Sequence, residues 1–69
     1  MFVLTVYNRK YDVIFTHAYY RLEYAIDGYT EFICENQDLV YFRIRLDKLT
    51  KSNHYKTIIE RIHHIWRTK

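Results

Sequence analysis

Hydrophobic and polar residues alternate along the first fifty residues, and polar breaks separate the alternating segments. The ranges 2–7 and 11–16 are rich in β-branched and aromatic residues, and they flank the polar triplet Asn8-Arg9-Lys10. Such a pattern is typical of two strands joined by a turn. The sequence therefore predicts an N-terminal hairpin.

The next segment predicts a second hairpin. Apolar and polar residues alternate again over 19–26, which indicates a strand with one solvent-exposed side. Asp27 and Gly28 follow, and Gly28 is the only glycine in the chain. Because glycine readily adopts the positive φ of tight turns, we expect a turn here and a further strand over 29–35.

The range 39–46 is predicted to be a strand with two contrasting sides. One side carries apolar residues, namely Val40, Phe42, Ile44 and Leu46. The other side carries Tyr41, Arg43 and Arg45. Because successive side chains of a strand point to opposite faces, the first set is expected to lie in the core.

After residue 50 the spacing of apolar residues changes. The apolar positions are Tyr55, Ile58, Ile59, Ile62, Ile65 and Trp66. This is the spacing of an amphipathic helix, and Ser52 or Asn53 is a natural N-cap. We therefore predict a helix over about 53–67.

These elements predict one α+β domain over residues 1–69. A small antiparallel sheet of about four to five strands, made of two hairpins and a basic strand, is packed by one C-terminal amphipathic helix. One helix covers one face of such a sheet. The residues expected beneath it include Tyr20, Tyr24, Phe32 and Phe42. The residues expected on the uncovered face are Tyr19, Arg21, Tyr41, Arg43 and Arg45.

Composition narrows the class of protein. An apolar content of 49% argues against a disordered chain, and 69 residues form a small domain of marginal stability. Cys34 is the only cysteine, so no disulfide forms within the chain. No signal peptide and no apolar run long enough for a membrane span is recognised. We expect a soluble, cytoplasmic protein without a membrane partner.

Charge is divided unevenly along the chain. Residues 1–38 hold three basic and six acidic residues, whereas residues 39–69 hold eight basic and two acidic residues. A polarised surface of this kind steers association with oppositely charged partners.

The run Tyr41-Phe42-Arg43-Ile44-Arg45 is the most suggestive binding signal, because tyrosine and arginine are enriched at protein interfaces. We predict a protein-binding surface made of Tyr19, Arg21, Tyr41, Arg43 and Arg45. A homodimer through the same face is a further reading of this pattern.

Nucleic-acid binding is the alternative function. Stacking rings and phosphate-binding cations also alternate in nucleic-acid interfaces. The residues that would contact phosphates are Arg43, Arg45, Lys48, Lys51, Lys56 and Arg61. A small ribonuclease toxin that uses scattered histidines, such as His63, is a third and weaker reading.

The sequence predicts no enzyme, no cofactor and no metal site. Glu60 and His64 are spaced i, i+4, but the adjacent His63 diverges from them around a helix, and zinc needs three or four converging ligands. The predicted strand phase of Cys34 places it on the apolar face, so we expect a small buried hydrophobe rather than a nucleophile.

In length, in tyrosine and lysine content and in the absence of proline, the chain resembles the small accessory proteins that phages and other mobile elements encode. The resemblance is one of general type, and no motif ties it to a specific family. It implies a non-enzymatic binder that inhibits a host defence, transcription or DNA-processing machine by stoichiometric occlusion. The implied partner is therefore a host protein.

Overall fold

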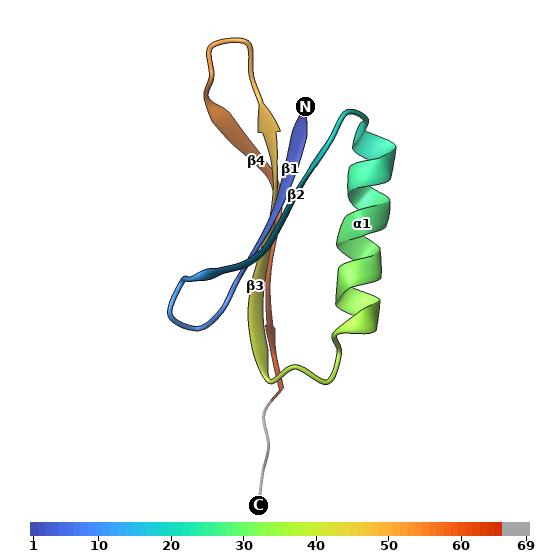
Figure 1. Cartoon of the computed structure of the whole chain (residues 1–69), viewed down its shortest axis with the longest axis vertical. Coiled ribbons are helices and arrows are strands. Elements are labelled where there is room, and N and C mark those ends of the chain that lie inside the picture. Colours follow the sequence, from blue (N-terminus) through green and yellow to red (C-terminus); the bar gives the residue numbers. More distant parts are fainter. Residues whose placement is uncertain (66–69) are drawn as a thin grey trace, which may run out of the picture.

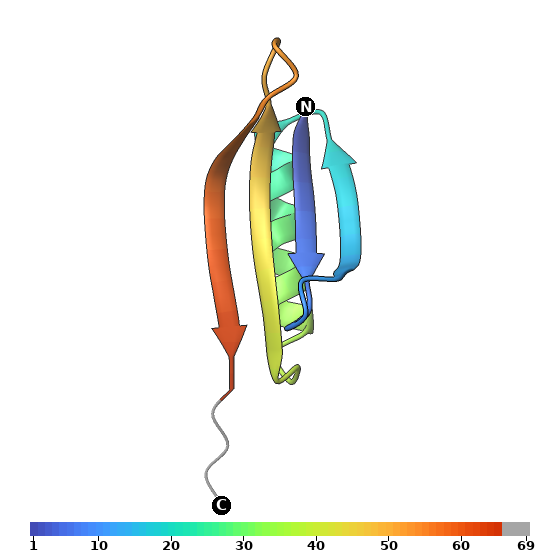
Figure 2. The same ribbon diagram turned by 90° about the vertical axis from the view of Figure 1, so that its left-hand side faces the viewer.

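The computed structural model describes residues 1–65, which form one antiparallel sheet and one helix. The elements along the chain are β1 (Phe2–Tyr7), β2 (Val13–Tyr19), α1 (Leu22–Glu35), β3 (Tyr41–Leu49) and β4 (Tyr55–His64). The strand order across the sheet is β2-β1-β3-β4. Helix α1 lies against one face of the sheet (Figure 1). Figure 2 looks onto the opposite face and shows α1 behind β1 and β3.

The prediction placed the helix in the wrong segment of the chain. The α+β class and the antiparallel sheet hold, but the helix lies at Leu22–Glu35, where strands 19–26 and 29–35 were predicted. Conversely, β4 occupies most of the range 53–67 that was predicted to be a C-terminal helix. The end of that predicted helix, including Trp66, lies outside the described residues.

Helix α1 forms because its inward stripe has helical spacing. Ala25 and Ile33 are buried, and Tyr29 and Phe32 pack against the core beside them. These four positions follow the i, i+4, i+7, i+8 pattern. The alternation that predicted a strand came instead from residues that remain exposed, such as Tyr24. Of the rings expected beneath a helix, Tyr20 and Tyr24 are 86% and 57% exposed, and Phe32 belongs to α1 itself. Only Phe42 is buried beneath a helix, and that helix is α1.

Gly28 lies inside α1 and not in a turn. Its φ is not positive, so conformational freedom does not explain the glycine. A Cβ at this position would meet the ring of Tyr19, only 2.7 Å from Cζ. Gly28 therefore lets the Tyr19 ring of β2 lie directly against the helix backbone.

The strand β4 forms because its residues favour extended structure, as the β-branched Thr57, Ile58 and Ile59 do. Leu46 pairs with Ile59 while Asp47 pairs with Thr57, so Ile58 is an extra residue that forms a bulge. The isoleucines of β4 do not share one face, since Ile59 lies opposite the buried Leu46 whereas Ile62 lies opposite Arg43. The spacing that imitates a helix therefore comes from apolar residues on both faces of the strand.

The core lies between the sheet and α1. Its buried residues are Leu4, Val6, Ala25, Ile33, Phe42, Ile44 and Leu46. A row of rings connects the elements: centroids are 5.5 Å apart for Phe15 and Phe32, 5.3 Å for Phe32 and Phe42, and 4.6 Å for Phe42 and His63. The stacked His63 ring extends this core to β4, which α1 does not cover (Figure 2).

Tyr29 also belongs to this covered side. Burial raises the pKa of its phenol above the usual 10.0, and the nearby positive charge of Arg61 partly opposes that rise.

Within residues 1–65 no helix has the length and apolarity needed to cross a membrane.

Candidate binding face

The face of the sheet opposite α1, here called the open face, is built from alternate residues of β3. Phe42, Ile44 and Leu46 are fully buried beneath α1. Because strand side chains alternate, the neighbouring Tyr41, Arg43 and Arg45 must project from the open face. Within this strand, Phe42, Ile44 and Leu46 are buried as predicted. Val40, which was also predicted to lie in the core, precedes β3 and is 43% exposed.

Neighbouring segments bring further rings and cations to the same face. Tyr7 of β1 pairs with Arg43, so both side chains lie on one side of the sheet. The loop between β1 and β2, residues 8–12, bends away from α1 (Figure 1). This loop supplies Arg9 and Tyr11.

Three arginines stack on three tyrosines across the open face. Arg43 Cζ lies 5.0 Å from the ring centroid of Tyr11, and Arg45 Cζ lies 5.6 Å from that of Tyr7. Arg9 Cζ lies 5.2 Å from the ring centroid of Tyr41. Each such contact contributes about 0.5–1 kcal/mol at an exposed site. We call these six residues the Tyr–Arg cluster.

Hydrogen bonds fix two of these arginines. Arg43 Nη1 donates to the Tyr11 hydroxyl at 3.0 Å, and Arg45 Nη2 donates to the Tyr7 hydroxyl at 3.1 Å. Arg45 Nε also donates to Asp47 Oδ2 at 2.8 Å. The cluster is therefore largely ordered before any partner arrives.

Asp47 anchors this arrangement from within the sheet. It is only 3% exposed, although it lies on the open face. Its second oxygen, Oδ1, accepts a hydrogen bond from Thr57 Oγ1 at 2.8 Å. Both carboxylate oxygens are thus satisfied, which allows a charged group to be buried beside Arg45.

The loop that carries Tyr11 is held in one shape. The Asn8 side-chain oxygen accepts hydrogen bonds from the backbone N–H groups of Lys10 and Asp12, each at 2.9 Å. Tyr11 has a φ of 65°, in the left-handed region that bulky residues rarely adopt. Strain of this kind is often retained where it positions a functional side chain. Here it places the Tyr11 ring against Arg43.

The far side of the cluster reaches β4. Arg9 Nη2 lies 3.3 Å from His64 Nε2, and the rings of Tyr41 and His64 meet edge to face with centroids 5.6 Å apart. The cluster thus extends from the β1–β2 loop across β3 to β4.

The structure brings together three of the five residues predicted for protein binding. Tyr41, Arg43 and Arg45 share the open face, but Tyr19 packs on the other side of the sheet against Gly28. Arg21 is the N-cap residue of α1 and pairs with Glu23 at 3.3 Å. Both were misplaced because the predicted strand 19–26 does not form.

Sequence reasoning missed Tyr7, Arg9 and Tyr11. Tyr7 could have been found from strand parity, since Leu4 and Val6 mark the buried side of β1. Arg9 and Tyr11 could not, because their position depends on how the loop bends over the sheet.

The six residues proposed for phosphate contacts do not form one track. Arg43 and Arg45 lie on the open face, whereas Arg61 pairs with the buried Ile44 and lies on the covered side. Lys48 pairs with Lys56 at the far end of β3 and β4, and Lys51 lies in the turn beyond them. The sheet therefore separates these charges.

Other candidate chemistry is also dispersed. Cys34 is exposed on α1 and not buried as predicted, since its expected strand is a helix. His63 stacks on Phe42 on the covered side, with its Nε2 buried and without a hydrogen-bond partner. Among residues 1–65, no three His, Cys, Asp or Glu side chains converge as metal ligands would.

Comparison with protein-family models, with curated proteins and with solved structures finds no significant match to this chain. The candidate site is therefore argued from its own geometry.

Proposed function

We propose that the protein is a non-enzymatic module that binds another protein through the Tyr–Arg cluster of its open face. The observation that carries this proposal is the ordered stacking of Arg9, Arg43 and Arg45 on three tyrosine rings. Tyrosine and arginine dominate the residues whose truncation most weakens protein interfaces. Ordering them in advance lowers the entropy that binding must overcome.

A protein partner fits this face better than a nucleic acid does. Each tyrosine ring already has a guanidinium against it, so the rings are not an open platform for bases. Asp47 also offsets the charge of Arg45 at 2.8 Å. Of the other residues proposed for phosphate contacts, Arg61 lies on the covered side, and Lys48, Lys51 and Lys56 lie at or beyond the far end of β3 and β4. Within residues 1–65 these proposed contacts therefore form no continuous path for a phosphate backbone.

The general type of the chain supports a host protein as the partner. Small phage accessory proteins act by stoichiometric occlusion, and a rigid face on a small sheet suits that role. A nucleic-acid-processing machine would present acidic or mixed surfaces that complement the three arginines.

The test compares two double variants that remove the same residue types. Tyr41→Ala/Arg43→Ala alters the cluster, whereas Tyr20→Ala/Arg21→Ala removes an exposed tyrosine and arginine elsewhere. Each protein is cross-linked in nuclease-treated host lysate, and captured proteins are identified by mass spectrometry. We expect the cluster variant to lose a protein that wild type and the control retain. Retained capture by a folded cluster variant would contradict the proposal.

A second measurement addresses nucleic acid directly. Fluorescence anisotropy against single-stranded DNA, duplex DNA and RNA at about 50 and 200 mM salt reports phosphate contacts. We expect weak binding with no dependence on Arg43. Tight binding that falls steeply with salt and survives Arg43→Lys but not Arg43→Ala would instead assign the face to nucleic acid, because phosphate contacts need charge more than guanidinium geometry.

A further inference from the structure

A second surface lies at the edge of the sheet formed by β2, on the side that faces α1. Because β2 is the end strand in the order β2-β1-β3-β4, the outer row of its backbone N–H and C=O groups has no pairing strand among residues 1–65. Such an edge can accept an additional strand.

The two edge strands differ in how they are protected. Natural sheets usually guard their edges with charged residues or proline. β4 carries Lys56, Glu60 and Arg61, but the sequence VIFTHAY of β2 has no charged residue and no proline. Val13 is 55% exposed and Ile14 49% exposed. β2 is thus an apolar edge strand that lacks the charged residues and proline that usually protect such edges.

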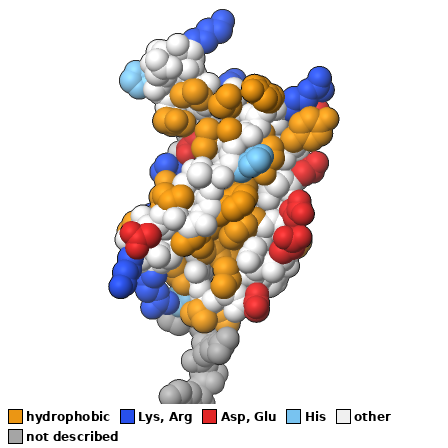
Figure 3. All heavy atoms as spheres, in the orientation of Figure 1, with side chains coloured by type: hydrophobic (Ala, Val, Ile, Leu, Met, Phe, Trp, Pro, Cys, Tyr) orange, Lys and Arg blue, Asp and Glu red, His pale blue; other side chains and the backbone are white. Residues whose placement is uncertain are grey.

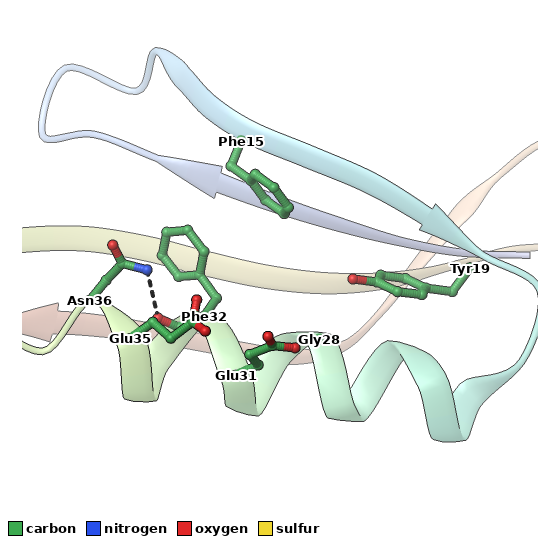
Figure 4. Close-up of a pocket in the computed structure, with 7 residues that line it drawn as sticks. All are labelled: Phe15, Tyr19, Gly28, Glu31, Phe32, Glu35 and Asn36. Carbon is green, nitrogen blue, oxygen red and sulfur yellow. Dashed lines mark hydrogen bonds between the residues drawn. The ribbon is translucent and has the colours of Figure 1, made fainter.

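A groove runs beside this edge, between β2 and α1. It has a volume of about 330 Å³, and its lining residues are Phe15, Tyr19, Gly28, Glu31, Phe32, Glu35 and Asn36. Figure 4 shows Phe15 of β2 and Phe32 of α1 approaching each other from opposite walls, with Glu31 and Glu35 projecting from the helix. The groove therefore combines aromatic walls with two carboxylates.

These carboxylates have no cation within the part of the chain that the structure describes. The ion pairs there are Arg21 with Glu23 and Arg45 with Asp47, and neither involves Glu31 or Glu35. In Figure 3, hydrophobic side chains gather down the middle of the side where β2 and α1 meet, and acidic side chains flank them over α1.

The acidity of α1 acts against its own stability. Glu23, Asp27, Glu31 and Glu35 recur every four residues, so like charges lie one turn apart. Glu35 ends the helix, where the dipole disfavours a negative charge, and the last turn has no basic residue. A bound cation at Glu31 and Glu35 would relieve this repulsion.

We propose that β2 and the adjoining groove bind an extended, basic segment of a partner protein by strand addition. The segment pairs with the β2 backbone as a fifth strand, so every second side chain faces the groove. A lysine or arginine there lays its aliphatic stem against Phe15 and Phe32. Its charged end reaches Glu31 and Glu35.

Charge argues for such a partner over a second copy of this chain. Two copies joined antiparallel through β2 are related by an axis perpendicular to the sheet, so both helices lie on the same face. Their acidic groove edges would then face each other across the junction, and like charges repel. A basic strand would instead place positive charge against the carboxylates of the groove.

The test uses a labelled peptide in which arginine and valine alternate over seven residues, the length of β2. Fluorescence anisotropy measures its binding to wild-type protein and to Glu31→Gln/Glu35→Gln. We expect the variant to bind at least about tenfold more weakly, since charge-assisted hydrogen bonds are lost. The matched control Glu23→Gln/Asp27→Asn removes the same charge from the same helix outside the groove, and it should bind as wild type does.

Amide hydrogen exchange then checks strand addition itself. The bound peptide should slow exchange in residues 13–19 and leave β4 unchanged. Equal weakening in both double variants would reduce the effect to net charge and overturn the proposal. So would the absence of peptide binding, or a self-associated protein whose β2 amides are protected without peptide. Neither result depends on the Tyr–Arg cluster, because the groove lies on the other side of the sheet.

Discussion

The two faces of the sheet are built from neighbouring residues of one strand, yet different forces hold them. On the covered face, Phe42, Ile44 and Leu46 are removed completely from water beneath α1. On the open face, Arg43 and Arg45 lie against tyrosine rings and donate hydrogen bonds to their hydroxyls. Burial of apolar area contributes far more free energy than partly exposed polar contacts do.

The difference shows how a chain of 69 residues separates stability from recognition. The period of two along β3 assigns alternate residues to the two tasks. Substitutions on the covered face should therefore unfold the protein, whereas most substitutions on the open face should change binding and keep the fold intact.

The largest effect is expected at Phe42. Phe42→Ala removes a fully buried ring that contacts both Phe32 and His63, so it should lower the free energy of unfolding by about 3–5 kcal/mol. Tyr41→Ala, one residue away on the open face, should cost less than about 1.5 kcal/mol. Urea denaturation of both variants measures the contrast. Equal losses would break the distinction between the faces.

Asp47 is the expected exception on the open face. Asp47→Ala leaves Arg45 Nε and Thr57 Oγ1 without their buried acceptor, so we expect a loss of about 1–3 kcal/mol. Asp12→Ala, which removes an exposed carboxylate from the loop, should stay within about 0.5 kcal/mol. Thermal unfolding of the two proteins compares them. A neutral Asp47→Ala would show that the cluster does not depend on its anchor.

Gly28 tests how closely β2 packs against the covered side. In an ordinary helix interior, Gly→Ala stabilises by about 1 kcal/mol. Here the added methyl group meets the Tyr19 ring, so Gly28→Ala should destabilise by about 1–3 kcal/mol. In a Tyr19→Ala background the same change should become stabilising. A double-mutant cycle measured in urea reports this reversal, and its absence would refute the steric explanation.

The smallest expected effect has the opposite sign. Glu31→Gln/Glu35→Gln removes like-charge repulsion along α1 and an unfavourable charge at its end, so stability should rise by about 0.5 kcal/mol at low salt. Thermal unfolding at low and high salt measures it, and the gain should shrink as salt screens the charges. A loss of stability would mean that these carboxylates support the isolated fold.

Sequence reasoning succeeded where alternation coincided with burial. The predicted strand 2–7 coincides with β1, and the two sides of β3 were assigned correctly from Phe42 and its neighbours. It failed over 19–35, where exposed Tyr24 and its neighbours alternated by chance and Gly28 was read as a turn. It failed again over 53–67, where Ile59 and Ile62 lie on opposite faces of β4 and their spacing imitates that of a helix.

The sequence by itself determined the antiparallel sheet and the contrast between the two sides of β3, because period-two alternation is a local property of the chain. The α+β class held although the helix on which it was based is a strand. Only the tertiary structure decided which segment is the helix, since Ala25 and Ile33 of α1 are buried against the sheet while residues 55–64 pair with β3 as a strand. It also decided how the candidate sites are assembled. The bend of the loop at Tyr11 completes the Tyr–Arg cluster, and the meeting of β2 with α1 creates the acidic groove, because both join residues that are distant in the chain.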